Sequence, residues 1–363
     1  MRDLFLLDPD VVFLNHGSFG ACPKPVFEEY QRLQRELERQ PVEFLGRERR
    51  YPELIEAAKT RLAAYVGAEP RNVVFTTNAT EALNTVARSL QLEAGDEVLA
   101  PAGEYGAVDM LWRHACERVG ARYVRRPLRL GAGPDEALEE LWAGVTPATR
   151  AVLVSHVSCF TGVIFPTREL CRRARERGLL SIVDGAHAPG QIPLELETLG
   201  ADFYSGNCHK WLCAPKGAGF LYARPERQAL LEPFVVSWDW EEEREFAARR
   251  RWQARATRRP GSPFRQRSTS RTRTAGMESG NAATGWPTML ARDWPPCWGA
   301  SRSRPRSHSC KWSVSRFLRA MRSRCNAGCS RSTGSRFCCK SSTASRSCAS
   351  RSRPTTARPT STG

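Results

Sequence analysis

The strongest constraint on the fold is an acid and an amine that follow two predicted strands. Residues 180–184 are mostly small or β-branched and end in Asp184, a pattern typical of a buried parallel strand. Lys210 comes 26 residues after Asp184, directly behind His209, in a glycine-rich turn that follows a second predicted strand at residues 201–205. Because the carboxyl ends of parallel strands lie at one edge of a sheet, we expect the carboxylate and the amine to face one pocket.

This is the pair of groups that pyridoxal phosphate requires. A carboxylate must keep the pyridine nitrogen of that cofactor protonated, and a lysine must form a Schiff base with its aldehyde. Residues 205–217, Ser-Gly-Asn-Cys-His-Lys-Trp-Leu-Cys-Ala-Pro-Lys-Gly, resemble the lysine loop of the class V aminotransferases of fold type I. Within that family, which includes the cysteine desulfurases, the loop is most similar to the isopenicillin N epimerase-like group. The resemblance implies a cofactor-dependent enzyme in which Lys210 and Asp184 are catalytic and no metal takes part.

A second landmark, at residues 73–83, predicts a phosphate site. A β-branched strand stops in small polar residues, and a helix with one apolar face then begins. Free backbone N–H groups and the positive end of the helix dipole bind anions at such a junction, although Asn78 or Thr80 would serve equally as a plain N-cap. The resemblance places four residues at the cofactor phosphate: Ala79, Thr80, Asn207 and His209.

Two further side chains are predicted beside the cofactor ring. Tyr105 follows the predicted strand at residues 96–101 and occupies the position where cysteine desulfurases carry a histidine stacked on the pyridine, with packing in the core as the alternative. His187 lies three residues after Asp184, where those enzymes place a glutamine beside the phenolic oxygen of the cofactor; the alternative is a buried histidine with satisfied hydrogen bonds. Residues 158–159 replace an asparagine pair of the desulfurases, so no cofactor contact is carried over to that loop.

The N-terminal residues are expected to reach the substrate. Residues 11–14 are apolar and predict a short strand, which runs into the turn Asn15-His16-Gly17-Ser18. A plain turn explains this pattern as well. In the family that the chain resembles, an Asn-His-Gly-Ser segment lies over the active site, which implies that Asn15 and His16 contact the substrate.

The order of predicted elements favours an α/β fold. Strands and helices alternate along residues 11–242 at spacings that require right-handed crossovers, which predicts a mostly parallel sheet. The resemblance implies the seven-stranded sheet of a fold type I enzyme, with pyridoxal phosphate at the carboxyl ends of the strands. Three segments are predicted: an N-terminal active-site segment at residues 1–22, a partial cofactor-binding large domain at residues 23–243, and an arginine- and serine-rich segment at residues 244–363 in place of the family's small C-terminal domain.

The positive charge of the chain is concentrated in that last segment. Residues 244–363 hold 25 Arg and 2 Lys against three acids, a net charge of +24, which leaves −7 of the overall +17 for residues 1–243. The segment contains no Ile or Tyr and a single Val, so it cannot bury enough apolar surface to offset chain entropy and is predicted to be disordered. Three origins fit this composition: a nucleic-acid-binding extension, a solvated linker, or a reading-frame error.

The genetic code favours a reading-frame error. GC-rich codons for residues 253–259 yield Gly-Thr-Arg-Asp-Pro-Ala when they are read from each third base, and residues 354–363 yield Tyr-Asn-Gly-Pro-Ala-Asp-Leu-Asp-Arg in the same frame. Both phrases resemble what the family carries at these places, and the first includes the Gly-Thr that reaches the phosphate of the neighbouring subunit. This interpretation implies a homodimer in the intact family and disfavours nucleic acid as a partner; the nucleotide sequence around codons 240–255 tests it.

Cysteine spacing and hydropathy favour a cytoplasmic protein. The six cysteines before residue 244 lack the paired spacing of small disulfide-rich domains, and residues 1–5 are too short and too acidic for a secretory signal. Apolar runs remain well below the 18 residues needed to cross a membrane. We therefore expect reduced thiols and no membrane partner.

The expected substrate is an amino acid or an amino-acid derivative. Once its α-proton has left, epimerisation, transamination and cleavage of a C–S bond are all open. The loop around Lys210 favours the epimerase-like group. A desulfurase or C–S lyase, and a family member without activity, are the alternatives.

Overall fold

The computed structural model describes residues 2–46, 49–233 and 246. The predicted reading-frame error and the predicted disorder of residues 244–363 therefore lie outside the described residues, apart from Phe246. The same holds for residues 235–240, the last part of the chain with the expected family pattern. Among the described helices, none is both long enough and apolar enough to cross a membrane.

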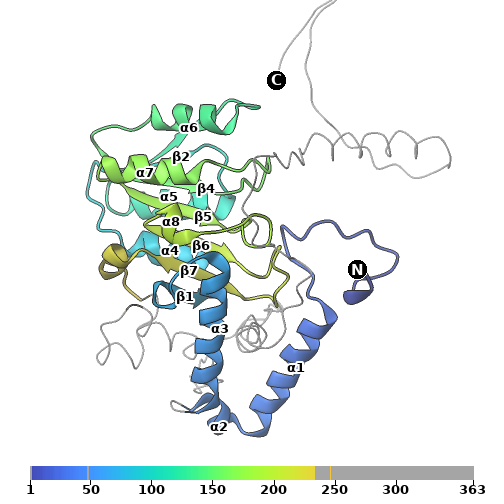
Figure 1. The fold of residues 1–363 in the computed structure, drawn as a ribbon. Coiled ribbons are helices and arrows are strands. Elements are labelled where there is room, and N and C mark those ends of the chain that lie inside the picture. The colour runs from blue at the N-terminus through green and yellow to red at the C-terminus, as the bar shows by residue number, and fades with distance from the viewer. Residues whose placement is uncertain (1, 47–48, 234–245, 247–363) are drawn as a thin grey trace, which may run out of the picture. The chain divides into compact units, whose positions relative to one another are not determined.

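A seven-stranded sheet carries the fold, as predicted (Figure 1). Neighbouring strands are parallel except at β7, which runs antiparallel to both of its neighbours. In spatial order the strands are β1 (Val73–Thr76), β7 (Gly219–Ala223), β6 (Phe203–Asn207), β5 (Leu180–Gly185), β4 (Thr149–Ser155), β2 (Glu97–Pro101) and β3 (Arg122–Arg126). Strands β4, β5 and β6 therefore lie side by side and end at the same edge.

Helices cover both faces of this sheet, so the central strands are apolar on both sides. One core packs α3 (Arg50–Val66), α6 (Pro134–Trp142), α7 (Thr167–Glu176) and α8 (Leu196–Leu199) against one face, and a second core packs α4 (Ala79–Ser89) and α5 (Gly106–Glu117) against the other. The remaining elements precede β1 or follow β7: α1 (Lys24–Arg39), α2 (Pro41–Leu45) and the 3₁₀ helices Arg2–Leu4, Pro70–Asn72 and Pro225–Leu230.

The strand expected at residues 11–14 is absent, so that prediction is wrong. Val12 is 77% exposed, and Val11 and Leu14 are also largely in contact with solvent. A strand requires a hydrogen-bonded partner, and the β-bridge that this part of the chain forms joins Phe5 to Pro23 instead. Apolar residues without a partner strand leave the segment irregular.

The N-terminal segment packs on the loop that carries Lys210. The Gly20 N–H donates to the His209 carbonyl at 2.9 Å, and Lys216 Nζ donates to the Gly20 carbonyl at 2.5 Å. A Cβ atom at Gly20 would lie 2.0 Å from the Lys210 carbonyl oxygen, so only glycine permits this approach. The two segments, far apart in sequence, are thereby held together.

Candidate active site

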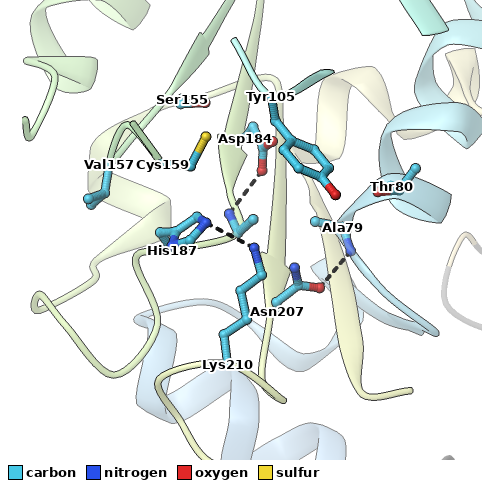
Figure 2. A pocket seen from close by; sticks show the side chains of 11 residues that line it. Ala79, Thr80, Tyr105, Ser155, Val157, Cys159, Asp184, His187, Asn207 and Lys210 are labelled. Atoms are coloured by element: carbon cyan, nitrogen blue, oxygen red, sulfur yellow. Dashed lines mark hydrogen bonds between the residues drawn. The ribbon is translucent and has the colours of Figure 1, made fainter. Parts of the chain in front are cut away.

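A pocket of about 330 Å³ lies at the carboxyl ends of β4, β5 and β6 and the amino end of α4 (Figure 2). Seven of the eight residues predicted to bind the cofactor line it. Its full lining is Ala79, Thr80, Tyr105, Ser155, Val157, Cys159, Asp184, Ala186, His187, Asn207 and Lys210.

Asp184 is the acid at the base of this pocket and is only 4% exposed. Its Oδ1 accepts the Ala186 N–H at 2.9 Å and the Ser205 hydroxyl at 3.3 Å. Across the described residues, no group donates to its second carboxylate oxygen, Oδ2. Burial raises the pKa of Asp184, and the Ala186 N–H and the charge of Lys210 oppose that rise. The carboxyl thus has a free oxygen for a cationic ring nitrogen.

Lys210 supplies the amine and lies three residues after the end of β6. Its Nζ is 2.9 Å from His187 Nε2 and 5.8 Å from the centre of the Tyr105 ring. Figure 2 shows the lysine side chain directed toward His187, with Asp184 and Tyr105 across the pocket from it. Burial lowers the pKa of Lys210, and attraction to Asp184 and Cys159 opposes that change. Burial therefore shifts both the lysine and Asp184 toward their neutral forms.

The amino end of α4 forms the other wall. Asn78 is the N-cap of this helix, since its side chain accepts the Glu81 N–H at 2.8 Å, which confirms the N-cap interpretation for Asn78. The Ala79 N–H donates to Asn207 Oδ1 at 2.8 Å. Within the described part of the chain, the Thr80 N–H has no hydrogen-bond acceptor, as expected for the first turn of a helix. A phosphate at this place would find a free donor and the positive end of the helix dipole.

Tyr105 and His187 both face the pocket. Tyr105 is 47% exposed, which is inconsistent with the alternative of core packing. His187 receives a hydrogen bond from Trp211 Nε1 at its Nδ1 and contacts Lys210 through Nε2. Burial, together with the charge of Lys210, lowers the pKa of His187 to about 4. A neutral imidazole therefore stands next to the amine.

Three predicted residues lie outside the pocket lining. His209 is buried and directs Nδ1 toward the Ala218 carbonyl at 3.0 Å. Asn15 bonds Ser18, and the His16 ring stacks on Trp211 at a centroid distance of 6.1 Å. Their predicted contacts with phosphate and substrate stay predictions.

Sequence reasoning missed a buried acid, Glu104, beside Tyr105. Its carboxylate accepts the Ser155 N–H at 2.9 Å and also the Ser155 hydroxyl. Burial first, and then the proximity of Asp184, raise the pKa of Glu104 to about 7, against the effect of the bonds from Ser155. The signal available in the sequence is an acid three residues after the predicted strand at residues 96–101.

This shifted carboxyl predicts a pH-dependent stability. Since the folded-state pKa of Glu104 lies above its ordinary value, the folded protein holds a proton that the unfolded chain releases, and the free energy of unfolding should fall as the pH rises from about 4.5 to 7. Glu104→Gln keeps an oxygen that accepts the Ser155 N–H, and its amide nitrogen can donate to the Ser155 hydroxyl oxygen; the substitution should remove roughly 3 kcal/mol of that fall. Urea unfolding at pH 5 and pH 8 measures this change in the free energy of unfolding. Glu117→Gln, at an exposed glutamate of α5, is the control, and equal pH slopes in all three proteins would contradict the prediction.

Comparison with known proteins settles the family. The model of the family described as Aminotransferase class-V matches residues 15–263, more than half of the chain. The chain belongs to the class V aminotransferase family. Pyridoxal phosphate is the cofactor of this family, and the site fits it: an amine, a buried acid with a free oxygen, and a helix N-terminus with a free N–H line one pocket.

The curated relatives of this family member have several different activities. It is 43% identical over 242 residues to isopenicillin N epimerase of Streptomyces clavuligerus, covering 66% of this chain and 60% of that protein. It is 29% identical to hercynylcysteine sulfoxide lyase of Schizosaccharomyces pombe, covering 66% and 61% of the two chains. A probable cysteine desulfurase of Xylella fastidiosa is 35% identical over 50% of this chain and 44% of its own. The chain thus spans about 60% of the length of this epimerase and of this sulfoxide lyase.

Solved structures confirm the fold. A C-DES mutant with glycine linked to its PLP cofactor aligns with a TM-score of 0.63 and 22% identity, over 80% of this chain and 71% of that chain. The cysteine desulfurase CsdA from Escherichia coli aligns with a TM-score of 0.61 and 24% identity, over 80% and 69% of the two chains. The predicted fold class is therefore confirmed.

Proposed function

We propose that this chain is an isopenicillin N epimerase-like enzyme that acts on the Cα atom of an amino acid or amino-acid derivative, with Lys210 as the residue that binds the cofactor covalently. The observation that carries the proposal is the convergence of Lys210, Asp184 and the amino end of α4 on one pocket. When bound, the cofactor supplies a sink for the electrons left by the departing α-proton. The protein's own residues supply the rest of the chemistry.

Each residue has a defined task. Lys210 takes the α-proton of the substrate on Nζ, because burial favours the neutral amine, and an epimerisation is completed when a proton returns to the opposite face of Cα. Asp184 holds a proton at the ring nitrogen through its free oxygen. The Thr80 N–H and the α4 dipole bind the phosphate, and Tyr105 covers the ring.

Cleavage of a C–S bond is the second candidate, since relatives named as a sulfoxide lyase and as probable desulfurases share the family. Cys159 is the cysteine that lines the pocket. Burial and the nearby Glu104 raise the pKa of its thiol, although Lys210 acts in the opposite direction. A thiol held in its protonated form is a poor nucleophile for sulfur transfer, which disfavours the desulfurase reaction. A C–S lyase needs no such thiol and stays the second candidate. We further propose a homodimer, on the basis of the family resemblance, and a cytoplasmic location, on the basis of the cysteine spacing and the lack of long apolar runs in the sequence.

Covalent labelling tests the proposal. After incubation with pyridoxal phosphate and reduction with borohydride, peptide mapping by mass spectrometry should locate the cofactor on Lys210. Lys216, in the same loop, and Lys59, in α3, are internal controls and should stay unlabelled, because Lys216 is bound to the Gly20 carbonyl and Lys59 to Glu56. A label distributed over all lysines, or none on Lys210, would overturn the assignment.

A further inference from the structure

Three side chains form a continuous line of hydrogen bonds that ends at the Lys210 amine. The Trp211 indole N–H donates to His187 Nδ1 at 3.2 Å. The other ring nitrogen, His187 Nε2, lies 2.9 Å from Lys210 Nζ. Trp211 directly follows Lys210 in the chain, and these two hydrogen bonds link its indole to the amine through His187.

The indole determines where the histidine carries its proton. An indole N–H is a donor and has no acceptor site, so His187 Nδ1 must present a lone pair to it. A neutral imidazole has one proton, which is therefore on Nε2. That N–H is directed at Lys210 Nζ, and only a neutral amine has the lone pair to accept it.

The other protonation states conflict with these contacts. A lysine ammonium could donate to His187 Nε2 only if the imidazole proton were on Nδ1, where it would face the Trp211 N–H. A doubly protonated imidazolium meets the same conflict at Nδ1. Burial also lowers the pKa of both His187 and Lys210, in agreement with a neutral pair.

Trp211 is held in place on both sides. A Cβ atom at Gly17 would lie 3.1 Å from Trp211 Cζ2 and 3.2 Å from His187 Cε1, so the N-terminal segment covers the pair closely. Gly190, with φ of +88°, approaches the Trp211 backbone, where a Cβ atom would lie 2.6 Å from its carbonyl carbon. The indole therefore keeps its direction toward His187.

We propose that Trp211 is a positioning residue which, by fixing the Nε2–H tautomer of His187, holds Lys210 as the neutral amine. The inference rests on the role proposed above for Lys210 and extends it. A neutral amine is the form that attacks an aldehyde and the form that accepts an α-proton. Four groups face this amine: Asp184 and Cys159 favour its charged form, Tyr105 presents its ring, and His187, directed by Trp211, acts against the charged form.

The tautomer of His187 can be measured directly in the full chain without cofactor. With ¹⁵N-labelled histidine, the resonances of His187 are assigned by their loss in His187→Gln. We expect Nδ1 to be unprotonated and Nε2 to carry the proton between pH 6 and 8. Trp211→Phe keeps an aromatic ring and removes the donor, so the ring should shift toward the Nδ1–H tautomer.

The second measurement is the reactivity of Lys210 toward acetic anhydride as a function of pH, with Lys59 and Lys216 as internal standards. Trp211→Phe frees His187 to accept a hydrogen bond from the ammonium form, so Lys210 reactivity at pH 7 should fall about tenfold to a hundredfold, as expected for a new bond to a charged group. When His187 is already replaced by leucine, Trp211→Phe should change the reactivity of Lys210 by less than about twofold, because Trp211 acts through the histidine.

Two results would overturn the inference: a proton on Nδ1 of His187 in the wild-type protein, or unchanged tautomer and lysine reactivity in a folded Trp211→Phe variant. The first needs no variant, so a misfolded substitution cannot obscure it. Neither measurement contains cofactor, whereas the proposed function fails on the borohydride label at Lys210. The two failures are therefore distinguishable.

Discussion

Lys210→Ala is expected to slow exchange of the α-proton of a bound amino acid by about 10⁴-fold, the upper end of the range for loss of a general base, because the same residue is also the covalent attachment point. Proton NMR in D₂O with small amino acids such as alanine measures this exchange in the cofactor-loaded protein. Removal of the side chain leaves a space beside His187, since the two groups are 2.9 Å apart. Added methylamine should therefore restore part of the rate.

Lys59→Ala is the matched control for this substitution. Lys59 lies in α3, pairs with Glu56 and does not line the pocket. Its replacement should leave the exchange rate unchanged. Equal rates of α-proton exchange in the wild type and in Lys210→Ala would show that the lysine takes no part in the reaction.

Asp184→Asn should have the second largest effect, a loss of about a thousandfold in α-proton exchange, typical of removing a charge that stabilises a transition state in a buried site. The amide oxygen of asparagine can still accept the Ala186 N–H, so the turn after β5 is kept while the charge is lost. The same NMR assay applies. Covalent attachment of the cofactor to Lys210 should persist, because the lysine is untouched.

Ser205→Ala distinguishes the effect of the Asp184 charge from the effect of the hydrogen bond that Ser205 donates to it. The Ser205 hydroxyl donates to Asp184 Oδ1 at 3.3 Å, a long hydrogen bond, so its removal should cost far less than loss of the carboxylate. If Asp184→Asn and Ser205→Ala behave alike, the negative charge is not what the site requires. A wild-type exchange rate in Asp184→Asn would refute its assigned role.

The parts of the fold that the sequence predicts are those with a strong local pattern. The apolar run before Asp184 and the loop around Lys210 lie where expected, because buried parallel strands require such runs and the loop residues carry a specific motif. β3 was not anticipated, since an edge strand of sequence Arg-Tyr-Val-Arg-Arg lacks the apolar signal of the central strands. Residues 11–14 have the apolar signal without a partner strand.

The site residues that the sequence missed depend on contacts between distant segments. Glu104 stands beside Tyr105, but its inward direction follows from a bond to Ser155, 51 residues away. Trp211 reaches His187 across 24 residues because two loops fold toward one another. Periodicity and motif spacing describe one helix, strand or loop at a time. They therefore predict which residues belong to the site better than they predict which other residues each of these contacts.

The place of β7 has a consequence for the order of folding. β7 follows every other strand in the chain, yet it lies between β1 and β6 and pairs with both. The Ala79 N–H, just after β1, and the Asn207 side chain, at the end of β6, are 128 residues apart in the chain, and β7 is the strand that joins β1 to β6. Long-range pairing of this kind is slow, because the entropy of closing a long loop is lost before the contacts form. We therefore expect a nascent chain to become able to bind its cofactor only after residue 223 has left the ribosome.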